Sequence, residues 1–273
     1  MRLEEWLADS LLRPGNPARP SVTLSYAQSL DGSIALRRGE RLALSGPESH
    51  KLTHLLRASH DAILVGIGTV LSDDPQLTAR LVEGNDPHII VLDSRLRTPT
   101  SARLLKGKPR IFCAASASRE AQGKLEKAGA IVERQADEKA TLVNLRVMLE
   151  KLKQIGINSV MVEGGGEIIS SFLNERLVDR LILTVAPQFV GGYKGLNLEL
   201  KQMPSLQDAK VERYGNDLVI WGKIAIPRRR PFVSLRVNSA ARSGQALGSA
   251  AKAGAKRPPR NDEERSGRGH EKV

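Results

Sequence analysis

The hydrophobic pattern between residues 19 and 226 alternates between strand and helix signals. Residues 19–26 alternate apolar and polar side chains, whereas 62–67 and 88–93 are continuous apolar runs typical of strands buried on both faces of a parallel sheet. Further strands are expected at 111–114, 131–132, 159–162, 181–186 and 217–222. Helices are expected from Pro47 onward, with Leu52, Leu55 and Leu56 on one face, and at about 117–128, 139–154 and 167–174.

The last two predicted strands, 181–186 and 217–222, have no long helix between them. An antiparallel edge on a mostly parallel sheet explains this change best. The fold class that follows is α/β, with three layers and a mostly parallel twisted sheet that has an antiparallel edge. Three parts are expected along the chain: an N-terminal extension at 1–19 with a short helix, a body at 20–226, and a disordered basic tail at 227–273.

The tail changes the interpretation of the overall charge. The formal net charge of +12 suggests a nucleic acid partner, but residues 227–273 hold 12 Lys and Arg against 4 Asp and Glu. The other 30 basic and 26 acidic residues leave the body only mildly basic. The tail has few large apolar residues, so it cannot bury enough surface to offset its ordering entropy. Aromatic residues make up 3% of the chain, so stacking platforms for bases are scarce.

Composition also bears on membranes, disulfides and metals. No apolar run approaches the roughly 20 residues of a membrane span, and no apolar signal core follows the N-terminus, so a cytoplasmic protein is expected. Cys113 is the only cysteine and lies in an apolar strand, which favours a packed core thiol. His50 and His54 are four residues apart, but Lys51 stands where a zinc protease has Glu, so we expect solvent-facing histidines and no metal site.

The strand at 159–162 runs into a glycine turn, Glu163-Gly164-Gly165-Gly166, and then into a helix. Such a turn points backbone N–H groups and the positive end of a helix dipole at one place, which binds phosphate. The turn is not the complete dinucleotide fingerprint, because Ile169 occupies the place of the third glycine and no acidic residue follows at the expected distance. A tight strand-to-helix turn without a ligand is the alternative.

The strand at 62–67 leads into a second candidate segment. Thr69 and Asp73 are four residues apart, so they share a face if the segment is helical. The structural alternative is that Thr69 caps a helix and Asp74-Pro75 forms a turn. Three arginines lie beside the candidate segments and carry groups that bind phosphate bidentately, although solvated surface arginines are the default interpretation: Arg41, Arg57 and Arg80.

Taken together, these segments resemble the reductase domain of bacterial riboflavin biosynthesis and its stand-alone archaeal and fungal relatives. The matching stretches are 19–32, 55–58, 62–80, 91–94, 162–166, 177–181 and 186–192, which cover about 20–225 in order. The resemblance implies a dihydrofolate reductase-like fold and a homodimer. It also implies hydride transfer from NADPH to C1′ of a phosphorylated ribosylaminopyrimidine, which gives a ribitylamino product.

The resemblance further implies roles for matched positions. Cofactor contacts would come from Ala27, Thr69, Asp73, Ser94, Gly165, Gly166, Glu167, Ile168, Ile169, Ser170 and Ser171. Substrate contacts would come from Arg41, Arg57, Leu77, Arg80 and Glu163, with the arginines facing the 5′-phosphate. Asp73 lies between the two sets, so it is the candidate catalytic residue for the proton shift that opens the sugar ring; positioning alone is the alternative.

Several alternatives stay open at this point. The chain is also compatible with a paralogue of the same fold that acts on a pterin or another heterocycle, and with a protein that binds nucleic acid through its basic tail in a salt-dependent way. Arg95 and Arg97 after Ser94 favour a 2′-phosphate, hence NADPH over NADH, without deciding it. A deaminase zinc site needs two cysteines, so deamination is expected from another protein, before or after this step.

Overall fold

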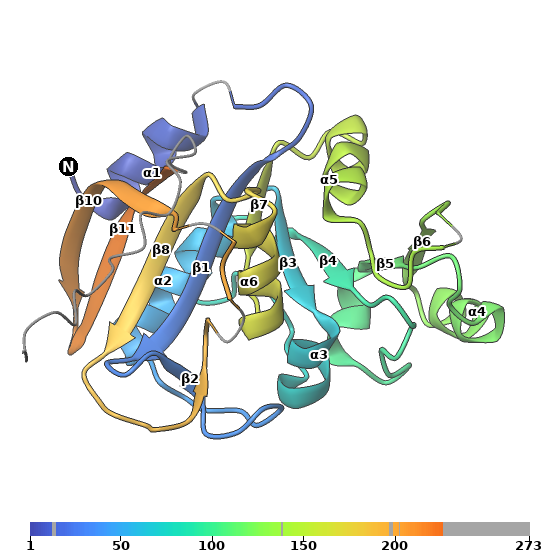
Figure 1. Ribbon diagram of the computed structural model, residues 1–273, viewed down its shortest axis with the longest axis horizontal. Helices are drawn as coiled ribbons and strands as arrows, with labels where there is room; N and C mark the ends of the chain where they lie inside the picture. Colours follow the sequence, from blue (N-terminus) through green and yellow to red (C-terminus); the bar gives the residue numbers. More distant parts are fainter. Residues whose placement is uncertain (13–14, 138, 197–198, 202, 226–273) are drawn as a thin grey trace, which may run out of the picture. The chain divides into compact units, whose positions relative to one another are not determined.

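The computed structural model describes residues 1–12, 15–137, 139–196, 199–201 and 203–225 (Figure 1). Its nine-stranded sheet contains β1 (Ser21–Ser29), β3 (Ala62–Gly66), β4 (His88–Leu92), β5 (Arg110–Cys113), β6 (Ile131–Arg134), β7 (Ser159–Val162), β8 (Arg180–Ala186), β10 (Ser205–Tyr214) and β11 (Asp217–Ala225). The helices are α1 (Leu3–Leu12), α2 (Pro47–Ala58), α3 (Ile67–Asp73), α4 (Arg119–Lys127), α5 (Leu145–Gln154), α6 (Gly166–Asn174) and the 3₁₀ helix η1 (Arg103–Gly107). A separate short ribbon pairs β2 (Ser33–Ala35) with β9 (Tyr193–Lys194).

The strand order of the large sheet is β10-β11-β8-β1-β7-β3-β4-β5-β6. All neighbours from β8 to β6 are parallel, and β11 runs antiparallel to both β8 and β10. The prediction of a mostly parallel sheet with an antiparallel edge is therefore confirmed. The five residues of β3 are all buried, as expected for a strand covered on both faces.

Helices cover both faces of the sheet, which gives the three layers (Figure 1). The core on one face joins α5 and α6 to side chains of β1, β3, β4 and β7. On the other face, α3, η1 and α4 pack on β3, β4 and β5, and α1 and α2 pack on β7, β8 and β11. Burying one large aliphatic side chain stabilises the fold by about 1.5–3 kcal/mol, so each face contributes substantially to the free energy of unfolding.

The strand expected at 62–67 ends one residue earlier, at Gly66. Ile67 begins α3, and Gly66, with φ −87° and ψ 159°, is the N-cap. The alternative in which Thr69 caps the helix is therefore wrong, and Thr69 and Asp73 lie one turn apart on α3 itself. The helix ends at Asp73, because the left-handed backbone of the C-cap residue Asp74 (φ 41°) and the following proline prevent its continuation.

Two other regions also differ from the sequence pattern. The helix expected near 139 begins at Leu145, because the Asn144 side chain accepts hydrogen bonds from the backbone N–H groups of Arg146 and Val147 and so caps it there. The pattern also does not predict β10, nor the ribbon of β2 and β9.

The N-terminal helix packs on the body of the protein. Leu3, Trp6 and Leu7 are buried in one core cluster with Leu52 and Leu56 of α2, so the predicted short helix is confirmed and adds to the core. No helix in the described part of the chain is long and apolar enough to cross a membrane. The predicted tail at 227–273 lies outside the described residues.

The single cysteine lies at the end of β5. Cys113 is fully buried with Ile111 and Leu125, so the prediction of a core thiol is confirmed. Burial raises the pKa of the thiol, which keeps it protonated and unreactive at neutral pH.

Candidate active site

Two neighbouring strands in the middle of the sheet send their helices to opposite faces. β7 continues into α6, whose Ile169 and Phe172 join the core on one face, whereas β3 continues into α3, whose Val70 joins the core on the other. In open α/β sheets, such a switch leaves a crevice outside the carboxyl ends of the strands, where ligands bind. β1 extends past β7 at this place, because residues 25–29 pair with β8 after the pairing with β7 has ended.

The glycine turn lies at this switch point, at the carboxyl end of β7. Gly165 is the N-cap of α6, and no side chain caps the helix. The N–H groups of the first helical residues, Gly166 and Glu167, therefore have no partner within the helix. A Cβ built on Gly165 meets nothing within 4 Å, so the space in front of the turn is open. Open space, free donors and the positive end of a helix dipole are what a pyrophosphate requires.

Gly164, one residue earlier, has a packing role. A Cβ on Gly164 would lie 2.6 Å from both Cβ and Cγ2 of Ile168, and a Cβ on Gly66 would lie 2.8 Å from its Cγ1. The side chain of Ile168 is therefore wedged between the ends of β7 and β3. This contact sets the height of the α6 N-terminus above the sheet, so Ile168 supports the turn from below.

The other predicted cofactor residues of α6 differ in what they can offer. The side chains of Ile169 and Ser170 are fully buried, and the N–H groups of Ile168 and Ile169 already donate to the carbonyl oxygen of Gly165. The structure therefore leaves Ile169 with no group directed to a ligand. The Ser170 hydroxyl is buried and has no hydrogen bond partner among the described residues, and Ser171 is half-buried.

The segment between β2 and α2 reaches the first turn of α6. Arg38 forms an ion pair with Glu167, which joins this segment to the glycine turn. Arg41, a predicted substrate contact, lies in the same segment and is exposed. No ion pair of Arg41 is found within the described part of the chain, whereas Arg38 and Arg57 are both paired.

The remaining predicted cofactor residues lie at the carboxyl ends of three strands. Thr69 and Asp73 are half-buried on α3, and the Ser72 hydroxyl donates a 2.6 Å hydrogen bond to Oδ1 of Asp73. Ala27 lies in the part of β1 that extends past β7. Ser94 follows β4, and its Oγ accepts a backbone N–H from the segment before α5 at 3.1 Å. The fold thus gathers all four around the crevice edge.

Two predicted substrate residues, Arg57 and Glu163, bind each other. Arg57 Nε and Nη2 donate to the two carboxylate oxygens of Glu163 at 2.9 and 2.8 Å, and Nη1 donates to the Thr78 carbonyl oxygen at 3.2 Å. The two side chains are only 12% and 19% exposed. Burial alone would lower the pKa of Arg57, but the charge and hydrogen bonds of Glu163 outweigh it, so the pKa is raised. The pair places a fixed carboxylate two residues before Gly165.

His54 lies beside this pair, and its burial differs from what the sequence predicts. His50 is exposed as expected, but His54 is only 3% exposed, so the prediction of a solvent-facing side chain is wrong for His54. It lies three residues before Arg57 on α2, so the two side chains share a face of the helix, and His54 is on the buried side. Burial, and then the charge of Arg57, lower the pKa of His54 to about 4, so it is neutral at pH 7. Its Nδ1 has no hydrogen bond partner in the described structure.

The loop after α3 holds Arg80 close to the same network. Leu77 has a left-handed backbone (φ 58°) and a buried side chain in the core beneath α3, so it anchors the loop. Arg80 Nη1 donates to the Thr78 hydroxyl at 3.3 Å, and Arg57 donates to the carbonyl oxygen of the same residue. Thr78 therefore joins the two arginines. Sequence reasoning missed Thr78, because its backbone carbonyl gives no signal in the residue pattern.

A second missed feature is a clasp at the end of β1. The Asp31 carboxylate accepts hydrogen bonds from Ser33 at 2.9 Å, from Lys194 at 2.6 Å and from the backbone N–H groups of Val190 and Gly191 at 3.0 and 2.9 Å. Lys194, followed by a hydroxyl and a backbone donor, holds the pKa of Asp31 far below its usual range. The clasp ties residues 187–194 to the β1–β2 turn.

No group of three or more potential metal-ligating side chains is found among the residues that the structure describes. The site consists of backbone donors, two arginines, two carboxylates and hydroxyl groups. This set suits anionic organic ligands, since it combines a phosphate cradle with charged groups beside it.

The comparison with known families decides the assignment. Residues 20–220 match the family model described as the RibD C-terminal domain. The chain belongs to this family. RibD of Aquifex aeolicus is 36% identical over 214 residues, which are 75% of this chain and 58% of that protein. The chain therefore spans little more than half the length of that RibD relative.

Shorter relatives of the RibD C-terminal domain family match over most of their length. A protein of Debaryomyces hansenii is 38% identical over 76% of this chain and 94% of its own length. A protein of Archaeoglobus fulgidus is 39% identical over 64% of this chain and 83% of its own length. Both are named 2,5-diamino-6-ribosylamino-4(3H)-pyrimidinone 5′-phosphate reductase.

Solved structures of the family share the architecture. The riboflavin biosynthesis reductase Rib7 of Saccharomyces cerevisiae aligns with a TM-score of 0.65 and 28% identity, over 82% of this chain and 97% of that one. RibD of Acinetobacter baumannii aligns with a TM-score of 0.65 and 27% identity, over 76% of this chain and 58% of that one. The predicted family is therefore confirmed.

Proposed function

We propose that this chain reduces the ribosylamino group of a phosphorylated pyrimidine with NADPH. The names of its D. hansenii and A. fulgidus relatives support the substrate class and the reduction, whereas the cofactor is inferred from the residues of the site. One observation carries the proposal. The open N-terminus of α6 at Gly165 lies two residues after Glu163, so a place for cofactor phosphates adjoins a fixed carboxylate and its arginine partner. A reductase needs this juxtaposition, since it must align a cofactor with the carbon that is reduced.

The residues present fit a nicotinamide dinucleotide. The N–H groups of Gly166 and Glu167 would hold the pyrophosphate at the start of α6, in the open space in front of Gly165. Ser94 at the end of β4 would bind the adenosine side, and Thr69 with Ala27 would border the nicotinamide. When bound, the cofactor supplies a hydride, and the fold provides position and exclusion of water.

The ion pair between Arg57 and Glu163 indicates where the substrate would bind. Glu163 has acceptor capacity left on both oxygens and would accept hydrogen bonds from the substrate, while Arg57 holds the carboxylate in place. Arg80 has free guanidinium donors for the 5′-phosphate. In the overall reaction C1′ gains a hydride, the exocyclic nitrogen keeps its bond to C1′, the ring oxygen becomes a hydroxyl, and one proton is consumed.

We assign the proton movement that opens the sugar ring to Asp73. Its carboxylate lies one turn from Thr69 on α3 and accepts a 2.6 Å hydrogen bond from Ser72. A group at this place is within one helix turn of the proposed cofactor contact and close to the loop that carries Arg80. A general acid–base group contributes typically about 10²–10⁴-fold to the rate.

The test is an NADPH-oxidation assay with the pyrimidine phosphate before and after deamination. We expect turnover of one of the two by wild-type protein, and a reduction of kcat by about 10²-fold or more in Asp73→Ala that exceeds any loss of NADPH affinity. Ser72→Ala is the matched control: it removes the hydroxyl donor and leaves the carboxylate. Absence of turnover with both substrates would refute the proposed function.

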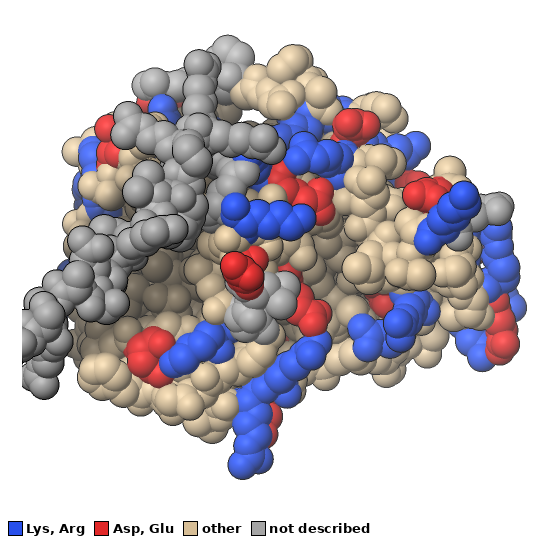
Figure 2. All heavy atoms as spheres, viewed as in Figure 1, with Lys and Arg blue, Asp and Glu red and all other residues tan. Residues whose placement is uncertain are grey.

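The distribution of charge gives no support to nucleic acid binding by the body. On the face in Figure 2, Lys and Arg side chains lie among Asp and Glu side chains instead of forming a stripe. A basic stripe along one face is the usual electrostatic footprint of a nucleic acid site. NADPH rather than NADH, a homodimer and cytoplasmic location remain predictions.

A further inference from the structure

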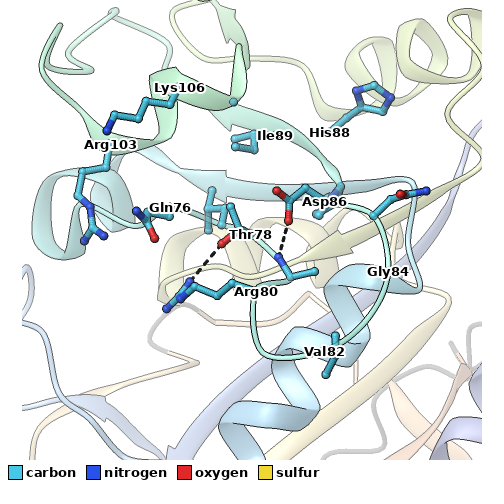
Figure 3. Close-up of a pocket in the computed structure, with 15 residues that line it drawn as sticks. Gln76, Thr78, Arg80, Val82, Gly84, Asp86, His88, Ile89, Arg103 and Lys106 are labelled. Carbon is cyan, nitrogen blue, oxygen red and sulfur yellow. Dashed lines mark hydrogen bonds between the residues drawn. The ribbon is translucent and has the colours of Figure 1, made fainter.

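A cavity of about 660 Å³ lies between the loop that carries Arg80 and the 3₁₀ helix η1 (Figure 3). Its lining includes Gln76, Thr78 and Arg80 from the loop, and Arg103 and Lys106 from η1. This volume is in the usual range of small-molecule sites. None of the residue roles implied by the family resemblance falls on η1, so this wall of the cavity has no assigned function.

The cavity is bounded by fixed backbone. The Asp74 Oδ1 accepts a hydrogen bond from the Arg103 backbone N–H at 2.8 Å, which ties the start of the loop to η1. The Asp86 Oδ1 accepts the Ala79 backbone N–H at 2.7 Å, which ties the end of the loop to its middle. The buried side chain of Leu77 fixes the loop from beneath. The opening between loop and helix is therefore a built feature of the fold.

The charge of the lining is strongly positive. The lining has three cations, Arg80, Arg103 and Lys106, and a single carboxylate, Asp86, so these four side chains sum to a formal charge of +2. No ion pair of these three cations is found among the described residues. In Figure 3 their side chains extend to the same side of the cavity, while Asp86 and His88 lie on the other side. Cations grouped without counter-ions favour an anion in the space between them.

The ion pair of Arg57 adds a reason to look for further cations. Both Nε and Nη2 of Arg57 are bound to Glu163, so its positive charge is already compensated. A phosphate monoester carries close to two negative charges at neutral pH, which Arg80 alone does not balance. The two cations of η1, next to Arg80 in the cavity lining, supply the missing charge.

We infer that this cavity binds a phosphate monoester, with Arg103 and Lys106 of η1 as additional phosphate-binding residues beside Arg80. The inference deepens the proposed function, on which it rests, by assigning the substrate 5′-phosphate to the cavity. η1 is then a specificity element, because it distinguishes a phosphorylated ribosylaminopyrimidine from the same compound without phosphate. A free phosphate anion has the same chemistry and is distinguished by the experiment.

The test uses the full chain with Arg103→Gln, Lys106→Gln and the double substitution. Lys108→Gln is the matched control, since Lys108 is an exposed cation at the end of η1 that does not line the cavity. The first arm measures binding of inorganic phosphate and of ribose 5-phosphate by calorimetry. We expect the double variant to bind each at least tenfold more weakly than wild type and Lys108→Gln to bind like wild type. Equal binding by wild type and double variant overturns the inference.

The second arm measures steady-state kinetics with the phosphorylated substrate and its dephosphorylated form. We expect the double variant to raise KM for the phosphorylated substrate about tenfold, to change kcat less than twofold, and to leave KM for the dephosphorylated form unchanged. A loss of phosphate binding in the first arm without a change of KM would assign the cavity to a free anion and overturn its assignment to the substrate. If the pyrimidine is not turned over at all, the first arm still decides whether the cavity binds phosphate.

Discussion

The two neighbouring glycines before α6 allow substitutions that separate folding from cofactor binding. Gly165→Ala puts a methyl group into open space, and the backbone of Gly165 (φ −73°, ψ 174°) is allowed for alanine. Alanine is a poorer N-cap than glycine, by roughly 0.5–1 kcal/mol. Alanine also restricts the unfolded chain, which stabilises the fold by about 0.4–1 kcal/mol. These effects oppose each other, so we expect the free energy of unfolding to change by less than about 0.5 kcal/mol.

The same methyl group occupies the space that the cofactor phosphates need. If it removes one hydrogen bond between a phosphate oxygen and the first turn of α6, binding loses about 1.5–3 kcal/mol. That loss corresponds to a dissociation constant for NADPH that rises by about 10- to 100-fold. Calorimetric titration of NADPH, together with urea unfolding of the same samples, measures both quantities.

Gly164→Ala is the control with the opposite expectation. Its Cβ would lie 2.6 Å from Cβ and Cγ2 of Ile168, and neither atom is the flexible end of a side chain. Overpacking of this kind costs about 1–3 kcal/mol, so the urea midpoint should fall. The reasoning is refuted if Gly165→Ala binds NADPH as wild type does, or if it destabilises the protein as much as Gly164→Ala.

Three further predictions concern the supporting network. Glu163→Gln removes the counter-charge of Arg57 and keeps one oxygen acceptor, so we expect a loss of about 2 kcal/mol in urea unfolding and a higher KM; an unchanged midpoint would contradict a stabilising pair. Burial lowers the pKa of His60 to about 4, so the unfolded state binds more protons than the folded state between pH 6.5 and 4. The stability that His60 contributes above pH 6.5 therefore falls by roughly 3 kcal/mol as the pH drops to 4. His60→Gln should make the free energy of unfolding depend less steeply on pH over this range. Asp31→Asn weakens the bond to Lys194, so hydrogen exchange should speed up in residues 187–194 and stay unchanged in β3.

The sheet could be predicted from the sequence where burial leaves a simple pattern. The segments 62–67 and 89–92 are apolar because helices cover both faces of β3 and β4. β10 lies at the sheet edge, where all of its side chains are exposed or half-buried, so its residues carry no hydrophobic pattern. The sequence therefore indicates the central strands and misses the edge.

The candidate site could be predicted in part. The glycine turn and the arginines were found from local chemistry and from the family resemblance. The contacts between them were not, because the Arg57–Glu163 pair joins residues 106 positions apart and Thr78 takes part through its backbone carbonyl. The inward orientation of His54 depends on how α2 packs, which the polarity of the residue does not reveal.

The most direct test of the central claim follows the hydride itself. The chain is incubated with NADPH labelled with deuterium at the transferable C4 position of the nicotinamide and with the ribosylaminopyrimidine phosphate, and the product is analysed by mass spectrometry and NMR. The account predicts one deuterium at C1′ of a ribitylamino product. An unlabelled C1′, or no oxidation of NADPH in the presence of either pyrimidine, would contradict it.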